Sequence, residues 1–494
     1  MRIKVRYISL ALLILFLMLS STIITPSQSN YFSVQKNPDE WFDGNFKGFF
    51  GENKDYLDGI IDGNINLGRT SSIGKFFGKC STFENETTGN IQGRFRNKIL
   101  TGIIKTDHSS NPCFFIGFIS LKDTGFEATI FSLKTKIMYI KGTYESSFLP
   151  PLTGPYGVGI KEMHLVDENR SERFTDDPND NREMMIRIWY PVNKEINTPY
   201  VEYMDTPTFA WLKDRSPVPL VTIPDNAYEF VGTHSFKDIN ISENKESYPV
   251  LIFSPGYDGV YQIYTSLIEN IVSHGFIVVS INHPYVSGIT VFPDGRKKYV
   301  SSNSTGDIGL NSVVGDAKFV LDEITKFNQS DEELMGRFDL SRVGMYGHSF
   351  GGASTAICCY EDSRFLCGLT LDGVFYVDNM TDGLSKPFMM MIAENRFNDE
   401  NAGDMWDLLN DDSYKVEIIG STHYAYSDVG VLLNHMVPLI PNKILGFGTI
   451  EPKRCVNITR MFELAFFEVY LKDGSVSNIM DLANSYEDVN FENK

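Results

Sequence analysis

The sequence has little positive charge, few cysteines and only one long apolar run. Its 494 residues include 44 Lys or Arg against 63 Asp or Glu, which gives a formal net charge of −19. Because nucleic-acid binding requires clustered Lys and Arg, this balance argues against a nucleic-acid partner. The single apolar run excludes a transporter with several membrane spans. A hydrophobic content of 42% still supports a large core, and the length suits roughly two or three domains.

The apolar run lies at the N-terminus and has the features of an export signal. It covers residues 7–24, follows basic residues at positions 2, 4 and 6, and precedes a small-x-small sequence at 27–29. These features are typical of a secretory signal peptide, and the run is also near the lower length limit of a membrane span. Residues 1–29 are therefore predicted to be a signal peptide or a membrane anchor. The protein is expected to be secreted, or attached to a membrane by this segment.

Export affects how the six cysteines are interpreted, because an oxidising compartment permits disulfides. Cys80 and Cys113 are the only cysteines in the N-terminal third of the chain, so they form the most economical pair. Cys358 and Cys359 are either disulfide partners or small hydrophobic residues buried on a helix. No C-x-x-C or H-x-x-x-H spacing occurs, which argues against a structural zinc site.

Residues 30–147 have the pattern of a β-rich domain. Short runs that suit strands are separated by Gly and Asn, glycine–aromatic pairs recur, and no pattern of helix length interrupts them. This pattern predicts an antiparallel meander or barrel. Because no cluster of titratable residues stands out, this region is predicted to be an accessory or attachment domain.

A proline-rich linker at 148–155 separates this region from one with a different pattern. From residue 148 to 494, runs that are apolar on both faces alternate with helical patterns. Such alternation is typical of a mostly parallel sheet covered by helices on both sides. Residues 148–494 are therefore predicted to form an α/β domain that carries the chemistry.

The sequence GHSFG at 347–351 identifies a candidate nucleophile. A β-branched and apolar run leads into Gly347, and a pattern of helix-forming residues begins after Gly351. A strand–turn–helix of this kind holds a serine in a strained backbone conformation and exposes its hydroxyl at the edge of the sheet. Ser349 is the predicted nucleophile, and the two glycines are expected because side chains there would collide across the turn.

A serine hydroxyl needs a base, and the base needs an acid that orients it. In this type of fold the chain order is serine, acid, histidine. His423 follows an apolar strand pattern and is favoured over His435, which lies within an apolar run. Asp372 and Glu394 each end a predicted strand, and topology alone does not separate them as the acid.

The oxyanion that forms during acyl transfer needs backbone donors. The amide of Phe350, which follows the nucleophile, is one expected donor. The second is expected from the sequence SPGYDG at 254–259, where Gly256 allows a sharp turn and Tyr257 presents its amide.

Several motifs in order make the chain resemble the platelet-activating factor acetylhydrolase family of α/β-hydrolases. They are TGPYGVG, REMMIRIWYPV, YPVLIFSPG, SHGFIVVSINH, DAKFVLDEI, GHSFGG, LTLDG and GSTH, and the resemblance as a whole extends over residues 153–471. The resemblance implies an α/β-hydrolase fold with Ser349 as nucleophile, Asp372 as acid and His423 as base. It further implies oxyanion amides at Tyr257 and Phe350. The implied activity is calcium-independent hydrolysis of short or oxidised acyl esters, with an ester or phospholipid substrate, a lipid-surface or membrane association, and no metal or organic cofactor.

The sequence departs from the family pattern in two places, and these departures leave the substrate undecided. The His-Gly that usually precedes the oxyanion residue is Pro255-Gly256 here, which is similar to polyester hydrolases and cutinases. The N-terminal β-rich region has no counterpart in the family. The alternatives are therefore a cutinase-like esterase, an acyltransferase with the same three residues, and a non-catalytic surface-binding protein on a hydrolase scaffold.

Overall fold

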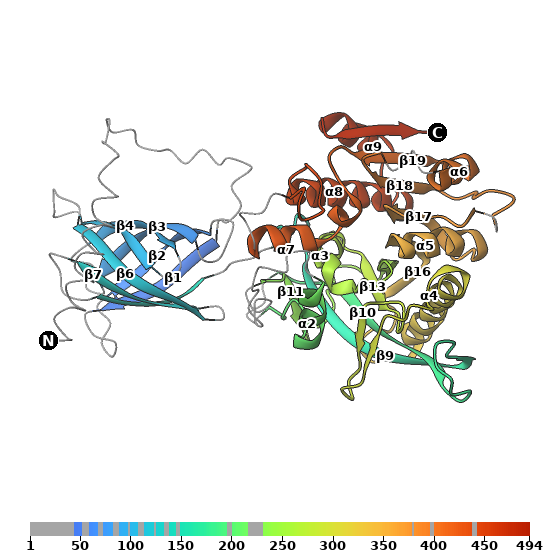
Figure 1. Ribbon diagram of the computed structural model, residues 1–494, viewed down its shortest axis with the longest axis horizontal. Helices are drawn as coiled ribbons and strands as arrows, with labels where there is room; N and C mark the ends of the chain where they lie inside the picture. Colours follow the sequence, from blue (N-terminus) through green and yellow to red (C-terminus); the bar gives the residue numbers. More distant parts are fainter. Residues whose placement is uncertain are drawn as a thin grey trace. The chain divides into compact units, whose positions relative to one another are not determined.

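The computed structural model describes the chain in several segments (Figure 1). They are the eight barrel strands given below, between residues 44 and 144, and residues 149–194, 200–215, 231–377, 380–395, 400–436 and 442–494. The predicted signal peptide or membrane anchor at 1–29 lies outside the described residues. In the described part of the chain, no helix combines the length and apolar content that crossing a bilayer requires.

The β-rich region forms a closed antiparallel barrel of eight strands. Its strands are β1 (Gly44–Gly51), β2 (Gly59–Leu67), β3 (Ile73–Thr82), β4 (Thr88–Arg96), β5 (Ile99–Thr106), β6 (Cys113–Lys122), β7 (Gly125–Ser132) and β8 (Met138–Tyr144). Each strand pairs with the next, and β8 pairs back with β1, so that no strand edge is left unpaired within the barrel. Aromatic residues pair with glycines across strands, as for Phe46 with Gly63 and Phe76 with Gly93. Of the two predicted β architectures, the structure has the barrel, while the predicted domain boundaries stay predictions.

The C-terminal region contains a ten-stranded, mostly parallel sheet, as predicted. Its strands, in spatial order, are β11 (Ser235–Lys237), β9 (Gly157–Ser171), β10 (Asn181–Val192), β13 (Ile277–Asn282), β12 (Tyr248–Ser254), β16 (Phe338–His348), β17 (Phe365–Leu371), β18 (Phe388–Ala393), β19 (Ser413–Ile418) and β20 (Val489–Asn493). The six strands from β13 to β19 run parallel, while β10 and β20 flank them in antiparallel pairing. A separate hairpin joins β14 (Ile289–Val291) and β15 (Lys297–Tyr299).

Helices cover both faces of this sheet (Figure 1). Helices α3 (Thr265–Ser273) and α8 (Pro452–Leu471) pack on one face, and α4 (Gly306–Ser330) and α5 (Phe350–Glu361) pack on the other. The remaining described helices are α2 (Thr206–Asp214), α6 (Glu400–Leu408), α7 (Asp428–Met436) and α9 (Ser477–Ser485). Every residue of β12, β13 and β18 is buried, which is the pattern of parallel strands covered on both faces.

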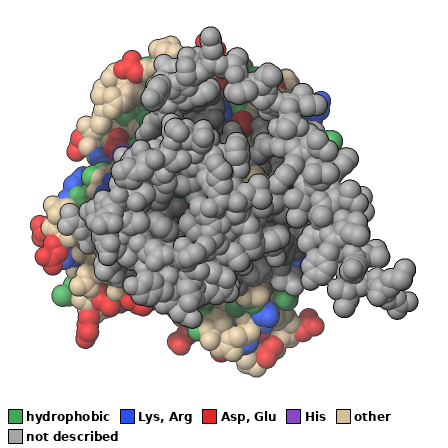
Figure 2. All heavy atoms as spheres, turned by 90° about the vertical axis from the view of Figure 1, so that its left-hand side faces the viewer, with side chains coloured by type: hydrophobic (Ala, Val, Ile, Leu, Met, Phe, Trp, Pro, Cys, Tyr) green, Lys and Arg blue, Asp and Glu red, His purple; other side chains and the backbone are tan. Residues whose placement is uncertain are grey.

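The cysteines whose side chains the structure describes are buried, and acidic side chains are common on the visible surface. Cys358 and Cys359 are free and fully buried on α5, which confirms their interpretation as small hydrophobic residues, and Cys367 and Cys455 are also free and buried. Cys80 lies on β3 and Cys113 on β6, and their side chains are outside what the structure describes. Acidic side chains are spread around the visible rim of the described surface, with single Lys and Arg side chains among them (Figure 2).

Candidate active site

Ser349 occupies a sharp turn between β16 and α5. Strand β16 ends at His348, and α5 begins at Phe350. The backbone of Ser349 has φ 52° and ψ −114°, a conformation that costs free energy for any residue with a side chain. The turn therefore places a half-buried serine at the carboxyl end of a central strand, where the sequence predicts the nucleophile.

Glycines make this turn sterically feasible. A Cβ atom at Gly347 would lie 2.5 Å from the backbone of Gly351 and 2.7 Å from the carbonyl oxygen of Ser254. A Cβ atom at Gly351 would lie only 2.0 Å from the same Ser254 oxygen. These contacts confirm the predicted reason for both glycines. A Cβ atom at Gly256 would lie 3.1 Å from Cβ of Ser349, so the segment that follows β12 packs directly on the turn.

Asp372 and His423 form a close pair. Asp372 directly follows β17, is 1% exposed, and its Oδ2 lies 2.5 Å from Nδ1 of His423. The backbone amide of Ala393 donates to its Oδ1 at 2.9 Å. Burial would raise the pKa of Asp372, but the hydrogen bond and charge of His423 outweigh it and lower that pKa below its usual value. An ionised carboxylate only accepts hydrogen bonds, so Nδ1 of His423 carries a proton and donates it to Asp372.

The structure gives side-chain contacts for Glu394 and His423, but not for His435. Glu394 is exposed, and its Oε2 accepts a hydrogen bond from the amide of Gly420 at 3.2 Å. His435 lies on α7, and its side chain is outside the described part. His423 begins the short 3-10 helix η5 (His423–Tyr426) and contacts Asp372.

His348 is a residue of the site that the sequence analysis missed. Its Nε2 lies 2.9 Å from the carbonyl oxygen of His423, and its Nδ1 lies 2.8 Å from the hydroxyl of Tyr264. Burial, followed by the charge of His423, lowers the pKa of His348 to about 3, so the ring is neutral. A carbonyl oxygen can only accept, so Nε2 donates to it and Nδ1 accepts from Tyr264. His348 thus fixes the backbone of His423, the candidate base. The sequence signal that could have identified His348 is its position directly before Ser349.

The two predicted oxyanion residues lie next to each other beside this turn. Phe350 is the first residue of α5, where amides have no partner within the helix. Tyr257 lies in a turn closed by a hydrogen bond from the Gly259 amide to the Gly256 carbonyl oxygen at 2.9 Å. The rings of Tyr257 and Phe350 pack edge to face, with centroids 6.3 Å apart. Their amides therefore come from two segments that meet at Ser349.

Among the residues that the structure describes, there is no group of three or more His, Cys, Asp or Glu that could hold a metal ion. The site is built from a serine, a histidine, an aspartate and backbone amides, which is the set of groups that acyl transfer uses.

Comparisons with known proteins show what the chain is similar to. The model of one protein family, described as platelet-activating factor acetylhydrolase, isoform II, matches residues 141–323 and 310–482. A protein of Arthroderma benhamiae named probable 1-alkyl-2-acetylglycerophosphocholine esterase is 25% identical over 364 residues, which are 68% of this chain and 89% of the relative. A cutinase of Thermobifida fusca is 25% identical over 207 residues, which are 40% of this chain and 56% of the relative.

A solved structure supports the fold. A ferulic acid esterase from Streptomyces cinnamoneus has a TM-score of 0.60 and 24% sequence identity, and the match covers 69% of this chain and 98% of that one. This similarity confirms the predicted α/β-hydrolase fold. The family match extends over more than half of the residues, so the chain belongs to the family of platelet-activating factor acetylhydrolase, isoform II, and is a carboxylic-ester hydrolase.

Proposed function

We propose that this enzyme hydrolyses short or oxidised acyl esters, phospholipid esters among them, through Ser349, His423 and Asp372. One observation carries the proposal. The strained Ser349 directly follows β16, and the contact between Asp372 and His423, 2.5 Å long, lies at the carboxyl end of the neighbouring strand β17. The family supports the ester chemistry, and the names of relatives support a phospholipid of the 1-alkyl-2-acetyl type.

The first half of the reaction forms an acyl-enzyme. Oγ of Ser349 attacks the ester carbonyl carbon while Nε2 of His423 accepts the hydroxyl proton. The carbonyl oxygen becomes an anion, and the amides of Tyr257 and Phe350 donate to it. When the tetrahedral intermediate collapses, the carbon–oxygen bond to the alcohol breaks, and the alcohol leaves with the proton from His423.

The second half uses the same groups. A water molecule attacks the acyl-enzyme while His423 accepts one of its protons, and the bond from the acyl carbon to Oγ of Ser349 breaks. The proton returns to Ser349, and the acid product leaves. Asp372 stays ionised throughout, keeps the imidazole in one tautomer and stabilises its charged form.

The direct test of the nucleophile is labelling by a fluorophosphonate, which reacts with activated serines. Wild-type protein is expected to be labelled stoichiometrically and to hydrolyse p-nitrophenyl acetate, and Ser349→Ala is expected to lose both properties. The exposed Ser341, which also lies on β16, supplies a control, because Ser341→Ala should react like the wild type. Labelling of Ser349→Ala would place the nucleophile elsewhere, and an unlabelled wild type would favour a non-catalytic role.

A cutinase-like substrate range is the second candidate, because Pro255-Gly256 replaces the usual His-Gly and a cutinase matches part of the chain. Release of products from an oxidised phospholipid and from a polyester film, measured with the same enzyme preparation, separates the two. We expect the phospholipid to be preferred, and equal or greater activity on the film would favour the cutinase-like range. EDTA should leave either activity unchanged, because no step requires a metal.

We further propose that the protein acts outside the cytoplasm. The support is the basic, apolar and small-x-small pattern of residues 1–29. Mass spectrometry of the mature protein tests this proposal. A cleaved signal predicts a first residue near position 30 and protein in the medium, and an uncleaved anchor predicts the full chain in the membrane fraction.

A further inference from the structure

A second set of serine, histidine and aspartate lies inside the domain. Ser254 ends β12, His283 follows β13, and Asp316 lies in the middle of α4. Nε2 of His283 is 3.2 Å from Oγ of Ser254, and its Nδ1 is 2.8 Å from Oδ2 of Asp316. All three residues are at most 1% exposed. Because no ester can reach them, this set cannot act on a substrate directly.

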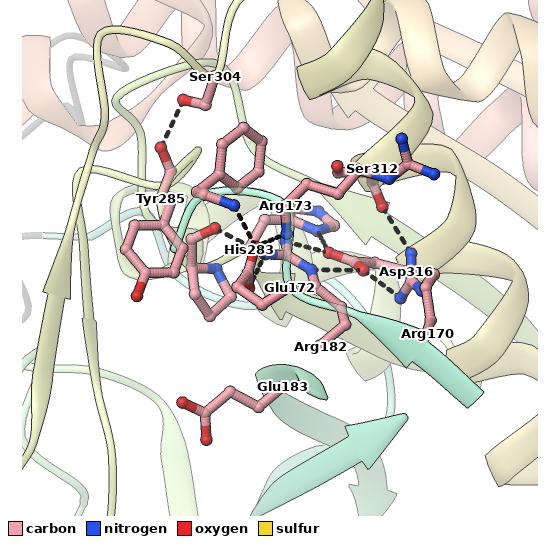
Figure 3. Close-up of polar contacts among 12 residues, drawn as sticks. Arg170, Glu172, Arg173, Arg182, Glu183, His283, Tyr285, Ser304, Ser312 and Asp316 are labelled. Atoms are coloured by element: carbon pink, nitrogen blue, oxygen red, sulfur yellow. Dashed lines mark hydrogen bonds and ion pairs between the residues drawn. The ribbon is translucent and has the colours of Figure 1, made fainter. Parts of the chain in front are cut away.

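Asp316 is the centre of a buried charge network (Figure 3). Oδ1 accepts from Nη2 of Arg170 at 2.5 Å and from Nε of Arg182 at 3.0 Å, and Oδ2 accepts from Nη2 of Arg182 at 2.6 Å. Nη1 of Arg182 also donates to Glu172 at 2.8 Å. Burial opposes ionisation of Asp316, but the charge of Arg182 and its hydrogen bonds with His283 and Arg182 outweigh burial and hold its pKa far below the usual value. Asp316 is therefore ionised and can only accept hydrogen bonds.

This charge state fixes the direction of both histidine contacts. Nδ1 of His283 must carry a proton, because Asp316 offers no donor. Burial lowers the pKa of His283, and the hydrogen bond to Asp316 does not compensate, so the imidazole is neutral. Its Nε2 then has a lone pair, and the hydroxyl of Ser254 donates to it. The network thus gives the Ser254 side chain one orientation.

Ser254 also lies between the turn that carries Ser349 and the turn that carries Tyr257. Its carbonyl oxygen is the atom that would collide with a Cβ at Gly347 and at Gly351. The chain continues from Ser254 through two residues to Tyr257, whose amide is a proposed oxyanion donor. A displacement of Ser254 would therefore move the oxyanion segment relative to the nucleophile.

The loop that begins at His283 holds the same segment from its other side. The Asp258 amide donates to the Val286 carbonyl oxygen at 3.0 Å, and the Gly288 amide donates to the Gly259 carbonyl oxygen at 3.0 Å. Arg182 fixes this loop as well, because its Nη1 donates to the carbonyl oxygen of Pro284 at 3.0 Å. The buried network thus contacts the oxyanion segment, residues 254–259, at Ser254. It also fixes the loop whose backbone binds Asp258 and Gly259.

We infer that Ser254 and His283 are positioning residues, and that their hydrogen bond, oriented by Asp316, holds the Tyr257 amide where the oxyanion forms. The inference rests on the proposed function, because it concerns the same oxyanion. Misplacement of a group by about 1 Å, or loss of one oxyanion donor, commonly costs 10²-fold or more in rate. The expected cost here is smaller, about 10- to 100-fold in kcat, because the amide is displaced but still present.

The test compares variants of the full-length enzyme. Ser254→Ala removes the hydroxyl, and His283→Asn keeps a donor that can replace Nδ1 toward Asp316 but loses the acceptor for Ser254. Both variants should lower kcat by about 10- to 100-fold with KM within twofold, because a group that acts on the transition state changes kcat. The affinity for a trifluoromethyl ketone, which places an oxygen anion in the oxyanion position, should fall by the same factor. The kcat and the inhibitor affinity of the double variant should be no lower than those of the single variants, because both changes remove the same hydrogen bond.

Ser280→Ala is the matched control. Ser280 is fully buried on β13 and accepts a hydrogen bond from Nε1 of Trp189 at 2.9 Å, on the side of β10. It should lower stability without changing kcat or inhibitor affinity. The inference is overturned if Ser254→Ala and His283→Asn behave like Ser280→Ala. If Ser254→Ala does not fold, His283→Asn decides alone. The proposed function fails separately, when the wild type neither hydrolyses esters nor binds the ketone.

Discussion

Two sets of serine, histidine and aspartate lie in the same α/β domain, and they differ in exposure rather than in composition. At the rim, Ser349 is half-buried on a strained turn, and the side chain of His423 is 33% exposed. Inside, Ser254, His283 and Asp316 are at most 1% exposed. The comparison teaches that three residue types at hydrogen-bond distance do not make a catalytic site. Access for the substrate and a strained serine are also needed.

The two aspartates also differ in their charged partners. Asp372 at the rim contacts His423 and a backbone amide, whereas Asp316 inside is bound by two arginines as well as by a histidine. After burial itself, the positive charge of these arginines is one of the causes that lower the pKa of His283. The inner histidine therefore stays neutral and holds its neighbours, while the side chain of His423 is partly exposed. Four predictions test these differences, from the largest expected effect to the smallest.

The largest loss of activity is expected from replacing Asp372, the aspartate at the rim of the sheet. Asp372→Asn should lower kcat by about 10⁴-fold, because an amide can donate to Nδ1 and then stabilises the wrong tautomer of His423. Steady-state kinetics with p-nitrophenyl acetate measures this loss. Glu394→Gln is the control and should keep wild-type kcat, because Glu394 contacts the Gly420 amide. Similar losses in both variants would contradict the assignment of the acid.

The inner aspartate should matter for stability. Asp316→Asn removes the buried charge between Arg170 and Arg182, and loss of one partner of such a network costs about 3–5 kcal/mol of unfolding free energy. Urea unfolding followed by fluorescence measures the change. Asp322→Asn breaks an exposed ion pair with Arg364 and should cost about 1 kcal/mol or less. An equally small change in Asp316→Asn would show that the inner network is not structural.

A smaller effect is expected from removing the hydroxyl of Tyr264, which donates to His348. Tyr264→Phe leaves the buried Nδ1 of His348 without its donor, 2.8 Å away in the wild type, and should cost about 1–3 kcal/mol of unfolding free energy. Tyr346→Phe is a matched control on β16, because the described residues offer the buried Tyr346 hydroxyl no hydrogen-bond partner. Its unfolding free energy should change little or rise. Equal losses in the two variants would contradict the role given to Tyr264.

A third buried aspartate shows what happens when the partners are neutral. Asp428 accepts from the Tyr203 hydroxyl and the Ser266 amide, each at 3.1 Å, and burial raises its pKa to about 7. Between its usual pKa near 3.9 and this value, the folded state binds a proton that the unfolded state releases. Stability should therefore fall as pH rises, by up to about 1.4 kcal/mol per pH unit, and level off above pH 7. Asp428→Asn should lose this slope in urea unfolding at pH 5, 6, 7 and 8, and an unchanged slope would contradict the assignment.

The nucleophile turn could be predicted from the sequence because its constraints are local. Gly347 and Gly351 flank Ser349, and the collisions that exclude larger residues occur across a turn of five residues. The position of His423 followed from chain order and from the strand before it. The choice of Asp372 over Glu394 came from the family resemblance, since both residues follow parallel strands that end at one edge.

The inner network could not be predicted, because its contacts join distant parts of the chain. Ser254 and His283 are 29 residues apart, and His283 and Asp316 are 33 apart. Some buried histidines accept a hydrogen bond from a serine, and others only pack in a hydrophobic core. No rule of sequence spacing distinguishes the two. Closure of the barrel was open for the same reason, because it depends on pairing of β1 with β8 rather than on any local pattern.

The position of the Ser254 carbonyl between Gly347 and Gly351 limits how the enzyme can be redesigned. Directed evolution that replaces Gly256, or Gly347 and Gly351, will mostly return inactive clones, because a side chain at these positions would press on the neighbouring segment. The side chains of Tyr257 and Phe350 take no part in these collisions, and their rings meet edge to face beside the nucleophile. A library at these two positions, with the glycines kept, is therefore the practical route to a new acyl preference.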